Sequence, residues 1–327
     1  MNNSLITFDT NCYRNLAENL TQDELTIAID NISLKEKENN IEAVYNPIVL
    51  LELFSHLADV NDPSYNVCKN SVVASYSHCK YLNNEGVEDF RILMDSEFQL
   101  CQLLFGVQSK DHIKVTTDLG KCAYAIYKDS SEVNINEYRD FYQSVNSYME
   151  NEEKIFVENM FQYVVKSFDP NCTNWQPLID DKKLRATFLN YIKTEPFENT
   201  IACSQVHKAI DICQIKNVTA EMLVEYSNLV RETFTASINL FREIIKRILE
   251  TGMDFSNKKR KRWNYYWDFH ILFSVTSQKI HGKPLILITS DEDMLKACID
   301  SGFEDKAKSL EEYLSSIKFD EELMKKI

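Results

Sequence analysis

Short apolar runs followed by helical patterns recur at both ends of the chain. Near the N-terminus, residues 4–8 (SLITF) are rich in β-forming side chains and predict a buried strand. Helical patterns follow over residues 11–20 and 22–32, and Thr21 is placed to cap the second of them. Near the C-terminus, residues 285–289 (LILIT) form a continuous apolar run, which is typical of a strand covered on both faces in a parallel sheet.

Further strands and helices extend this pattern at both ends. Residues 43–45 predict a second strand, with Asn46 as the N-cap of a helix that begins with a proline. We expect a helix over residues 263–280 (WNYYWDFHILFSVTSQKI) and then a turn at HGKP. After the strand LILIT we expect a short helix that stops at Gly302, and a last strand followed by a helix that begins at Ser309.

The middle of the chain has a helical pattern without a convincing strand. Residues 220–250 predict the clearest helix, because their apolar positions step by three and four. Such a regular stripe is typical of core packing. Loops are expected at 168–177 and 251–262, where turn-forming residues cluster.

The two ends and the middle therefore predict different parts of one protein. We expect an α/β domain built from residues 1–62 and 258–327, with its central parallel sheet drawn from both termini. Residues 63–257 would be a large all-α insertion in this domain.

Composition supports a helical protein without a membrane span. The 327 residues are 44% hydrophobic and include only 6 glycines and 6 prolines, so turns are few and helices long. No apolar run approaches the roughly 20 residues that cross a bilayer. The first residues lack the basic and apolar regions of a secretory signal, so a cytoplasmic protein without a membrane partner is expected.

Charge and cysteine usage narrow the classes of function. A net charge of −14 disfavours a protein that coats nucleic acid by bulk electrostatics, although a local basic track remains possible for an enzyme. The densest basic run comprises Lys258, Lys259, Arg260, Lys261 and Arg262. Aromatic residues follow it, so the run suits either phosphate contacts beside base-stacking rings or a solvated loop that leads into a buried helix.

Zinc binding is not predicted. The 9 cysteines include no CxxC pair and suit small buried side chains in a reducing compartment. Cys203, His207 and Cys213 come closest to a zinc-like cluster, but a fourth ligand at usable spacing is missing.

Acidic residues stand where the predicted strands end. Asp9 directly follows the first strand, and Asp291 follows LILIT, with Asp293 two residues later. The carboxyl ends of parallel strands meet at one edge of a sheet, where ligands bind. Glu52 would reach the same edge from the helix after Pro47, and Asp268 lies at the end of an apolar stripe in its own helix.

Carboxylates crowded together raise one another's pKa unless a cation compensates them. Oxygen ligands of this kind suit Mg²⁺ or Mn²⁺, which also accept substrate phosphate. One or two such ions can lower the pKa of a bound water and orient its attack on phosphorus. The sequence therefore predicts hydrolysis of phosphodiester bonds.

Four segments, in this order, resemble the PIN-domain nucleases. Asp9-Thr10-Asn11 is similar to the family's opening D-[ST]-[NS], and YNPIVLLELF is similar to its second strand and the helix with an inward Glu. WDFHIL resembles the helix that bears the third acid. LILITSDEDM resembles the strand and T-x-[DN]-x-[DE] segment that carries the fourth.

The resemblance covers roughly residues 1–60 and 262–327 and implies a three-layer α/β/α domain with a divalent-metal site. It implies an endoribonuclease that leaves 5′-phosphate and 3′-hydroxyl ends, in a toxin or antiviral-defence setting. An inhibitory or regulatory protein, or a second copy of the chain, could bind the insertion. The assigned residues are the metal-binding acids Asp9, Glu52, Asp268 and Asp291, with Asp293 as a further ligand, and the supporting residues Thr10, Asn11, Thr289 and Ser290.

Other interpretations of the same residues stay open. Asp9 can simply cap the following helix, and Asp291 and Asp293 compete for one role as acids at a helix N-terminus. A Toprim-like nuclease is an alternative because Asp291-Glu292-Asp293 imitates its DxD element, although that family has a Glu directly after its first strand. The remaining alternative is a catalytically inactive PIN-like scaffold that binds nucleic acid or protein through its helical insertion.

Overall fold

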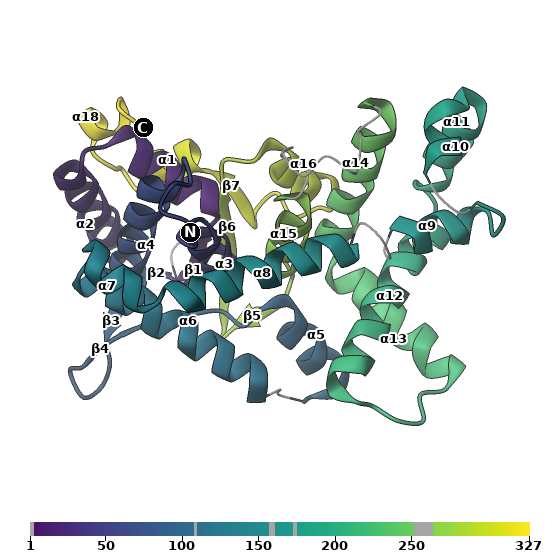
Figure 1. Ribbon diagram of the computed structural model, residues 1–327, viewed down its shortest axis with the longest axis horizontal. Coiled ribbons are helices and arrows are strands. Elements are labelled where there is room, and N and C mark those ends of the chain that lie inside the picture. Colours follow the sequence, from purple (N-terminus) through teal and green to yellow (C-terminus); the bar gives the residue numbers. More distant parts are fainter. Residues whose placement is uncertain (1–2, 108–109, 157–160, 173–174, 252–263) are drawn as a thin grey trace.

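The computed structural model describes residues 3–107, 110–156, 161–172, 175–251 and 264–327. Strands and helices alternate at both ends of the chain, and helices dominate its middle (Figure 1). The N-terminal elements are β1 (Ser4–Phe8), α1 (Thr10–Asn19), α2 (Gln22–Glu38), β2 (Ile41–Ala43) and α3 (Pro47–His56). The middle elements are α4 (Tyr65–Cys79), β3 (Lys80–Leu82), β4 (Glu88–Phe90), α5 (Ser96–Phe105), α6 (Lys110–Lys128), α7 (Glu132–Glu137), α8 (Arg139–Ile155), α9 (Phe161–Phe168), α10 (Gln176–Asp180), α11 (Lys182–Tyr191), α12 (Glu195–Cys213), α13 (Ala220–Thr233) and α14 (Thr235–Thr251). The C-terminal elements are α15 (Asn264–Ile271), a 3₁₀ turn (Leu272–Ser274), β5 (Lys279–Ile280), β6 (Lys283–Thr289), α16 (Glu292–Asp300), β7 (Ala307–Ser309), α17 (Leu310–Ser316) and α18 (Glu321–Met324).

The main sheet joins the two ends of the chain. β1 lies between β2 and β6 and pairs with both in parallel, and β6 also pairs with β7 in parallel and with β5 in antiparallel orientation. In the register of β1 and β6, Leu5 is opposite Leu285 and Phe8 is opposite Ile288. The prediction that the first and last strands share a parallel sheet is confirmed.

The central strands are covered on both faces. All residues of β1 are buried, as are Leu285 to Thr289 of β6, so apolar side chains leave the sheet in both directions. On one face the ring of Phe8 contacts Tyr13, His78 and Tyr313, which come from α1, α4 and α17. The molecule is an α/β protein, as the apolar run of the last long strand predicts.

Side-chain caps explain why several helices begin where they do. Thr21 and Ser309 each form a capping box with a glutamate three residues later, and Asn46 accepts a hydrogen bond from the backbone N–H of Ile48. These bonds satisfy donors that a helix start otherwise leaves without partners. All three caps agree with the sequence prediction.

The sheet and the helix at residues 263–280 differ from the prediction. The sheet is mixed rather than wholly parallel, because β5 runs antiparallel to β6. The predicted helix ends as α15 at Ile271, continues as the 3₁₀ turn and gives way to β5. A tight reversal follows, in which His281 and Gly282 have φ values of 50° and 78°, and it folds β5 back on β6.

The prediction that the insertion is all-α is wrong. Strands β3 and β4 form an antiparallel hairpin, and Ile92 after it makes an isolated parallel bridge with Tyr45. The predicted single helix over residues 220–250 is two helices, α13 and α14, which meet at Phe234. The backbone there has φ −111° and ψ 36°, and the buried Phe234 ring lies 4.4 Å from Phe273. The spacing of apolar residues by three and four continues through Phe234, so the sequence pattern does not indicate this break.

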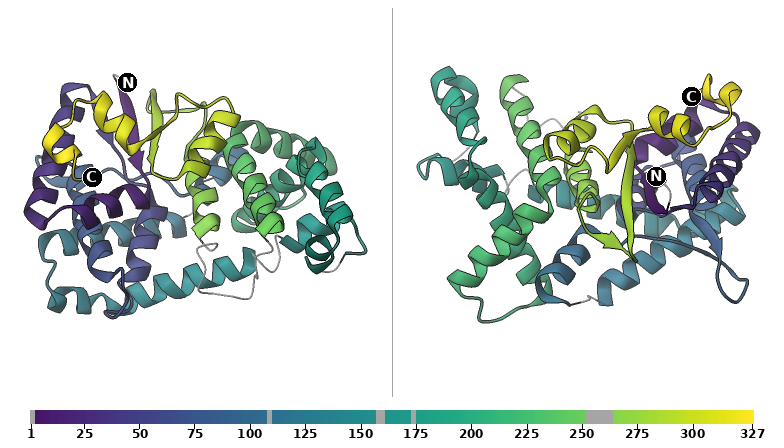
Figure 2. Two further views of the ribbon diagram at one scale, coloured as in Figure 1. Left: turned by 90° about the horizontal axis from the view of Figure 1, so that it is seen from above. Right: turned by 180° about the vertical axis from the view of Figure 1, so that it is seen from behind.

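The insertion surrounds the sheet unevenly. Helices α4, α6 and α7 lie near α1 to α3, whereas α9 to α13 form a lobe that extends away from the sheet (Figures 1 and 2). Helix α8 packs along α3, and α14 packs against α15 and α16. Within the described residues, none of these helices has the length and apolar character that crossing a membrane requires.

Candidate functional site

Asp9 lies where β1 passes into α1. It is 2% exposed, and its backbone N–H continues the sheet by donating to the carbonyl of Ile288. Its Oδ1 caps α1 by accepting from the N–H of Cys12 at 2.7 Å, and its Oδ2 accepts from the hydroxyl of Thr289. Burial is the main cause that raises the pKa of Asp9, and the negative charge of Asp291 adds to it. The capping role and a place in an acidic site therefore coexist in one side chain.

Glu52 approaches Asp9 from α3. The helix carries Glu52 on a partly buried position among apolar neighbours, and the hydroxyl of Thr10 donates a hydrogen bond to its Oε2. Burial is the main cause that raises the pKa of Glu52 to about 7, and the charge of Asp9 contributes in the same direction. The guanidinium of Arg14, one turn after Thr10, acts against this rise. The Thr10 hydroxyl thus orients the Glu52 carboxylate.

Thr289 and Asp291 shape the end of β6. The buried Thr289 hydroxyl donates to Asp9 and accepts the backbone N–H of Asp291 at 3.0 Å. Asp291 caps α16 by accepting from the N–H of Met294 at 2.9 Å. Ser290 is exposed and accepts from the Nδ2 of Asn15 at 3.2 Å. One threonine therefore links the two acids that end neighbouring strands.

Asp268 stands at the electrostatic centre of the group. It is partly buried on α15, and desolvation raises its pKa well above the ordinary value for an aspartate. The negative charges of Glu52, Asp291, Asp9 and Asp293 raise the pKa of Asp268 further, in that order. Acids from the four separate segments that the sequence singles out therefore influence the ionisation of Asp268.

Asp293 differs from the other acids because it forms an ion pair with an arginine. Its two carboxylate oxygens lie 2.7 and 2.5 Å from the guanidinium nitrogens of Arg247, which comes from α14 of the insertion. Asp291 has no such pairing among the interactions of the described residues and lies two residues after the end of β6, at the N-cap of α16. This difference favours Asp291 over Asp293 for the role that the sequence left open between them. Asn11, in the first turn of α1, is half-buried.

The donor set fits Mg²⁺ or Mn²⁺ in its chemistry. Its side chains offer carboxylate and hydroxyl oxygens, and the pKa values of Asp9, Glu52 and Asp268 are all raised by burial and by the charge of at least one other carboxylate. A divalent cation would relieve this repulsion. Within the described residues, no three His, Cys, Asp or Glu side chains are already gathered closely enough to hold a metal ion. Asp9 and Asp291 instead point one oxygen each at a helix N-terminus.

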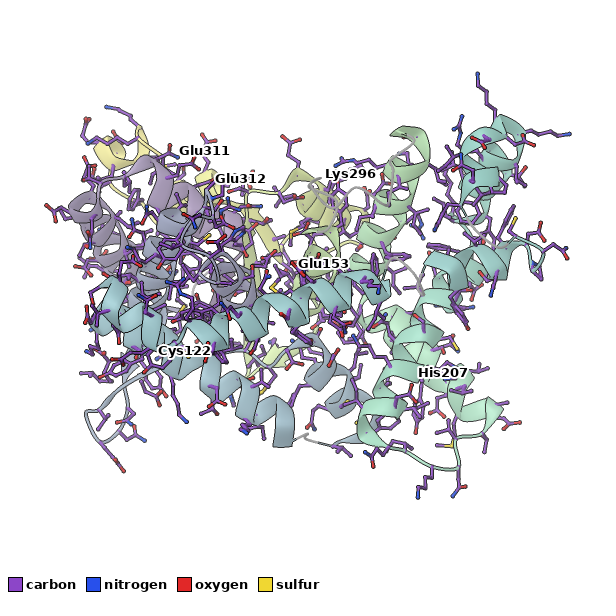
Figure 3. The ribbon with its side chains drawn as sticks, in the orientation of Figure 1. Cys122, Glu153, His207, Lys296, Glu311 and Glu312 are labelled. Carbon is purple, nitrogen blue, oxygen red and sulfur yellow. The ribbon has the colours of Figure 1, made fainter. Side chains whose placement is uncertain are left out.

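Two residues near the site were missed by sequence reasoning. Arg14 is the cation beside Glu52, and it also donates to Ser64 at 3.3 Å. Glu153, on α8 of the insertion, accepts from the indole N–H of Trp267 at 2.7 Å (Figure 3). A signal for Glu153 exists, because it continues the buried stripe of α8 four residues after Met149. An acid in such a stripe is unusual and could have been noticed.

Two other groups of residues from the sequence analysis lie apart from this site. The basic run of residues 258–262 falls outside the described residues. Cys203, His207 and Cys213 lie along α12, in the lobe that extends away from the sheet, and His207 is exposed (Figure 3).

Comparison with known proteins adds no relative to this picture. No protein-family model matches the chain, and neither a curated protein nor a solved structure shows significant similarity to it. The functional argument therefore depends on the residues of the site themselves.

Proposed function

We propose that this protein is a PIN-like, divalent-metal-dependent nuclease that hydrolyses phosphodiester bonds in RNA. The observation that carries the proposal is that Asp9 and Asp291 follow neighbouring parallel strands, while the charges of Glu52, Asp291 and Asp9 all raise the pKa of Asp268. The group lies at the carboxyl ends of two neighbouring parallel strands, the place where open α/β sheets bind ligands. Buried acids that raise one another's pKa are costly to a fold, so their retention favours a function.

The residues of the site would hold the metal ion, orient its ligands or bind the phosphates of the substrate. Asp9, Glu52, Asp268 and Asp291 would hold Mg²⁺ or Mn²⁺, which supplies an activated water and charge stabilisation at phosphorus. Thr10 orients Glu52, and Thr289 orients Asp9. The helix starts of α1 and α16 face the same edge, and their backbone N–H groups favour the acids that cap them. The basic run of residues 258–262, directly before α15, would supply cations for the phosphates of the substrate.

A nuclease assay with matched variants tests the proposal. Wild-type protein, Asp268→Asn and the double variant Asp9→Asn, Asp268→Asn are incubated with labelled single-stranded RNA and with DNA of the same sequence, in Mn²⁺ or in EDTA. We expect Mn²⁺-dependent cleavage by the wild type and a fall of at least about a hundredfold in both variants, because ligands to a catalytic metal are lost. Glu292→Gln is the control, since this exposed acid adjoins Asp291 without joining the group.

The same assay distinguishes the alternative of an inactive scaffold. That alternative is favoured by the capping bonds of Asp9 and Asp291, which give both acids a structural role. If the wild type leaves RNA and DNA as intact as the double variant does, the scaffold interpretation is correct. Equal cleavage by all the proteins would indicate a contaminating nuclease and would also count against the proposal.

A further inference from the structure

Helix α1 carries a cation on the same face as Thr10. Arg14 follows Thr10 by four residues, so the two side chains are neighbours along the helix. The Thr10 hydroxyl donates to the Glu52 carboxylate, so this face of α1 is turned toward α3. Helix α1 also packs against both α3 and α4 (Figure 1). Arg14 therefore lies one helical turn from the contact between Thr10 and Glu52.

The donors of the Arg14 guanidinium are only partly used. Among the described residues, its one hydrogen bond is the donation from Nη2 to the hydroxyl of Ser64 at 3.3 Å, and its buried Nε has no acceptor. Arg247, in contrast, is bound by both carboxylate oxygens of Asp293. A guanidinium is always charged, and burying part of a charge without a matched partner is costly. A half-buried cation with donors to spare therefore favours an anionic ligand.

The residues around Ser64 hold its hydroxyl in place for this contact. The Oδ1 of Asp62 accepts the N–H of Ser64 at 2.7 Å, and its Oδ2 lies 3.0 Å from the Nδ1 of His56. His56 is on α3, four residues after Glu52. Ser64 stands at the N-cap of α4, yet its hydroxyl makes no capping bond and accepts from Arg14 instead. The end of α3 and the start of α4 thus orient the guanidinium.

Phosphate is the anion that this arrangement suits. The guanidinium presents its N–H donors in a planar fork that matches the oxygens of a phosphate group. A divalent cation held by the acids would bind one phosphate of an RNA strand. Because every nucleotide adds another phosphate, a cation one helical turn from Glu52 can meet a second group of the same strand.

We propose that Arg14 binds a phosphate group of the RNA substrate next to the acids, with Ser64 holding its guanidinium in place. This inference rests on the proposed function and deepens it, because it names a substrate-binding side chain among the described residues. The phosphate is the same in every nucleotide, so the contact strengthens binding without selecting a base.

The test measures binding of a fluorescein-labelled, single-stranded RNA to the full chain by fluorescence anisotropy, in EDTA and over a series of NaCl concentrations. Arg14→Gln removes the charge, and we expect its Kd for RNA to rise about tenfold at low salt. The slope of log Kd against log salt concentration should fall by about 0.7, the value for one phosphate contact with a single strand. DNA of the same sequence should show the same two changes, because the phosphate is common to both.

Two matched variants distinguish a phosphate contact from other roles of Arg14. Lys37→Gln makes the same charge change on an exposed side chain before the start of β2, at the opposite edge of the sheet, and its Kd should stay within about twofold of the wild type. Ser64→Ala removes the acceptor of Arg14 and leaves the charge, so its salt slope should equal that of the wild type. If Arg14 only anchors the start of α4, Arg14→Gln will lose stability as Ser64→Ala does and keep the wild-type slope, and the inference fails.

The outcomes separate this inference from the function on which it rests. A wild type that binds and cleaves RNA, with an unchanged Kd and slope in Arg14→Gln, overturns the role of Arg14 alone. Binding that depends on Arg14, without cleavage in Mn²⁺, supports the phosphate contact and overturns the nuclease function. A wild type that neither binds nor cleaves RNA overturns both.

Two further measurements keep the inference falsifiable. If the wild type cleaves RNA but does not bind it in EDTA, KM for cleavage in Mn²⁺ replaces Kd, and an unchanged KM in Arg14→Gln refutes the inference. If thermal melting shows that Arg14→Gln does not fold, Arg14→Met replaces it, because this variant keeps the apolar stem of the side chain. A wild-type salt slope in Arg14→Met would then refute the inference.

Discussion

Glu36 and the acids around Asp268 have different electrostatic surroundings. Glu36 of α2 is 3% exposed, and its Oε1 lies 2.8 Å from the Nε2 of His78 and 2.6 Å from the hydroxyl of Tyr313. The other ring nitrogen of His78 is hydrogen-bonded to Tyr13 at 2.8 Å. One acid is thus surrounded by a base and hydroxyl groups from α1, α4 and α17.

The acids at the strand ends have the opposite surroundings. Around Asp268, the strongest electrostatic influences are other carboxylates, those of Glu52, Asp291 and Asp9 first among them. A buried acid with matched partners stabilises the arrangement of the elements that it joins, whereas acids that repel one another weaken the folded state. The contrast distinguishes a buried acid whose partners stabilise the fold from acids whose mutual repulsion weakens it.

The largest effect expected from this comparison is the loss of the Glu36 network. Glu36→Ala leaves His78 and Tyr313 without their acceptor, and we expect the free energy of unfolding to fall by about 3 to 5 kcal/mol, as when a buried pair loses one member. Urea denaturation at pH 7 measures it. Glu36→Gln keeps an oxygen acceptor and should lose less. Glu38→Ala, on the exposed side of the same helix, removes only a surface pair with Lys35 and should cost less than about 1 kcal/mol.

If Glu36→Ala lowers the free energy of unfolding by less than about 1 kcal/mol, the comparison fails, because the hydrogen bonds of Glu36 would then contribute little to stability. The parallel measurement on Glu38→Ala guards against a general effect of removing charge from α2, which lies beside the sheet in Figure 1.

The placement of Asp9 and Asp291 after two neighbouring strands could be predicted from the sequence, because each strand end has its own local pattern. The strand before Asp9 and the strand before Asp291 are apolar, short and followed by capping residues, and their pairing follows from the parallel rule. Glu52 could be placed on a helix because Asn46 and Pro47 mark its start. Local patterns were sufficient for Asp9 and Asp291, because each of them caps the helix that follows its strand.

The partners of the acids could not be predicted in the same way. Glu36 joins His78 and Tyr313 across 42 and 277 residues of sequence, and no local spacing reports such a contact. Glu153 reaches Trp267 from the insertion, whose place in the fold depends on packing rather than on any motif. The hairpin of β3 and β4 was missed for a related reason, since its three-residue strands are too short for a period of two to stand out.

The second effect concerns pH and Glu52. The pKa of Glu52 is about 7 in the folded chain and about 4.5 in an unfolded one, so between these values the folded state binds more protons and stability falls as pH rises. Glu52→Gln abolishes this ionisation. We expect the variant to match the wild type near pH 4 and to exceed it at pH 8 by no more than about 3 kcal/mol, less where solvent screens the partly exposed carboxylate.

Urea denaturation of both proteins in EDTA, at several pH values from 4 to 8, measures this difference. The sign is the critical point: removal of Glu36 should weaken the fold, and removal of Glu52 should strengthen it at pH 8. A variant that is less stable than the wild type at pH 8 would place Glu52 among the structural acids and remove the contrast between the two groups.

The smallest expected effect is that of substituting Thr289, which is both a structural hydrogen-bond partner and a neighbour of the acids. Its buried hydroxyl donates to Asp9 and accepts from the N–H of Asp291, so it is a structural contact inside the acid site. Thr289→Val keeps the shape and loses both bonds, and we expect about 1 kcal/mol less stability in urea at pH 7. Because the Thr289 bond lowers the pKa of Asp9, its loss should also move the acidic limb of Mn²⁺-dependent cleavage to higher pH. Thr289→Ser restores the hydroxyl and should restore the acidic limb of the wild type. If the pH profile is the same in all three proteins, Thr289 supports the sheet and leaves the charge of Asp9 unaffected.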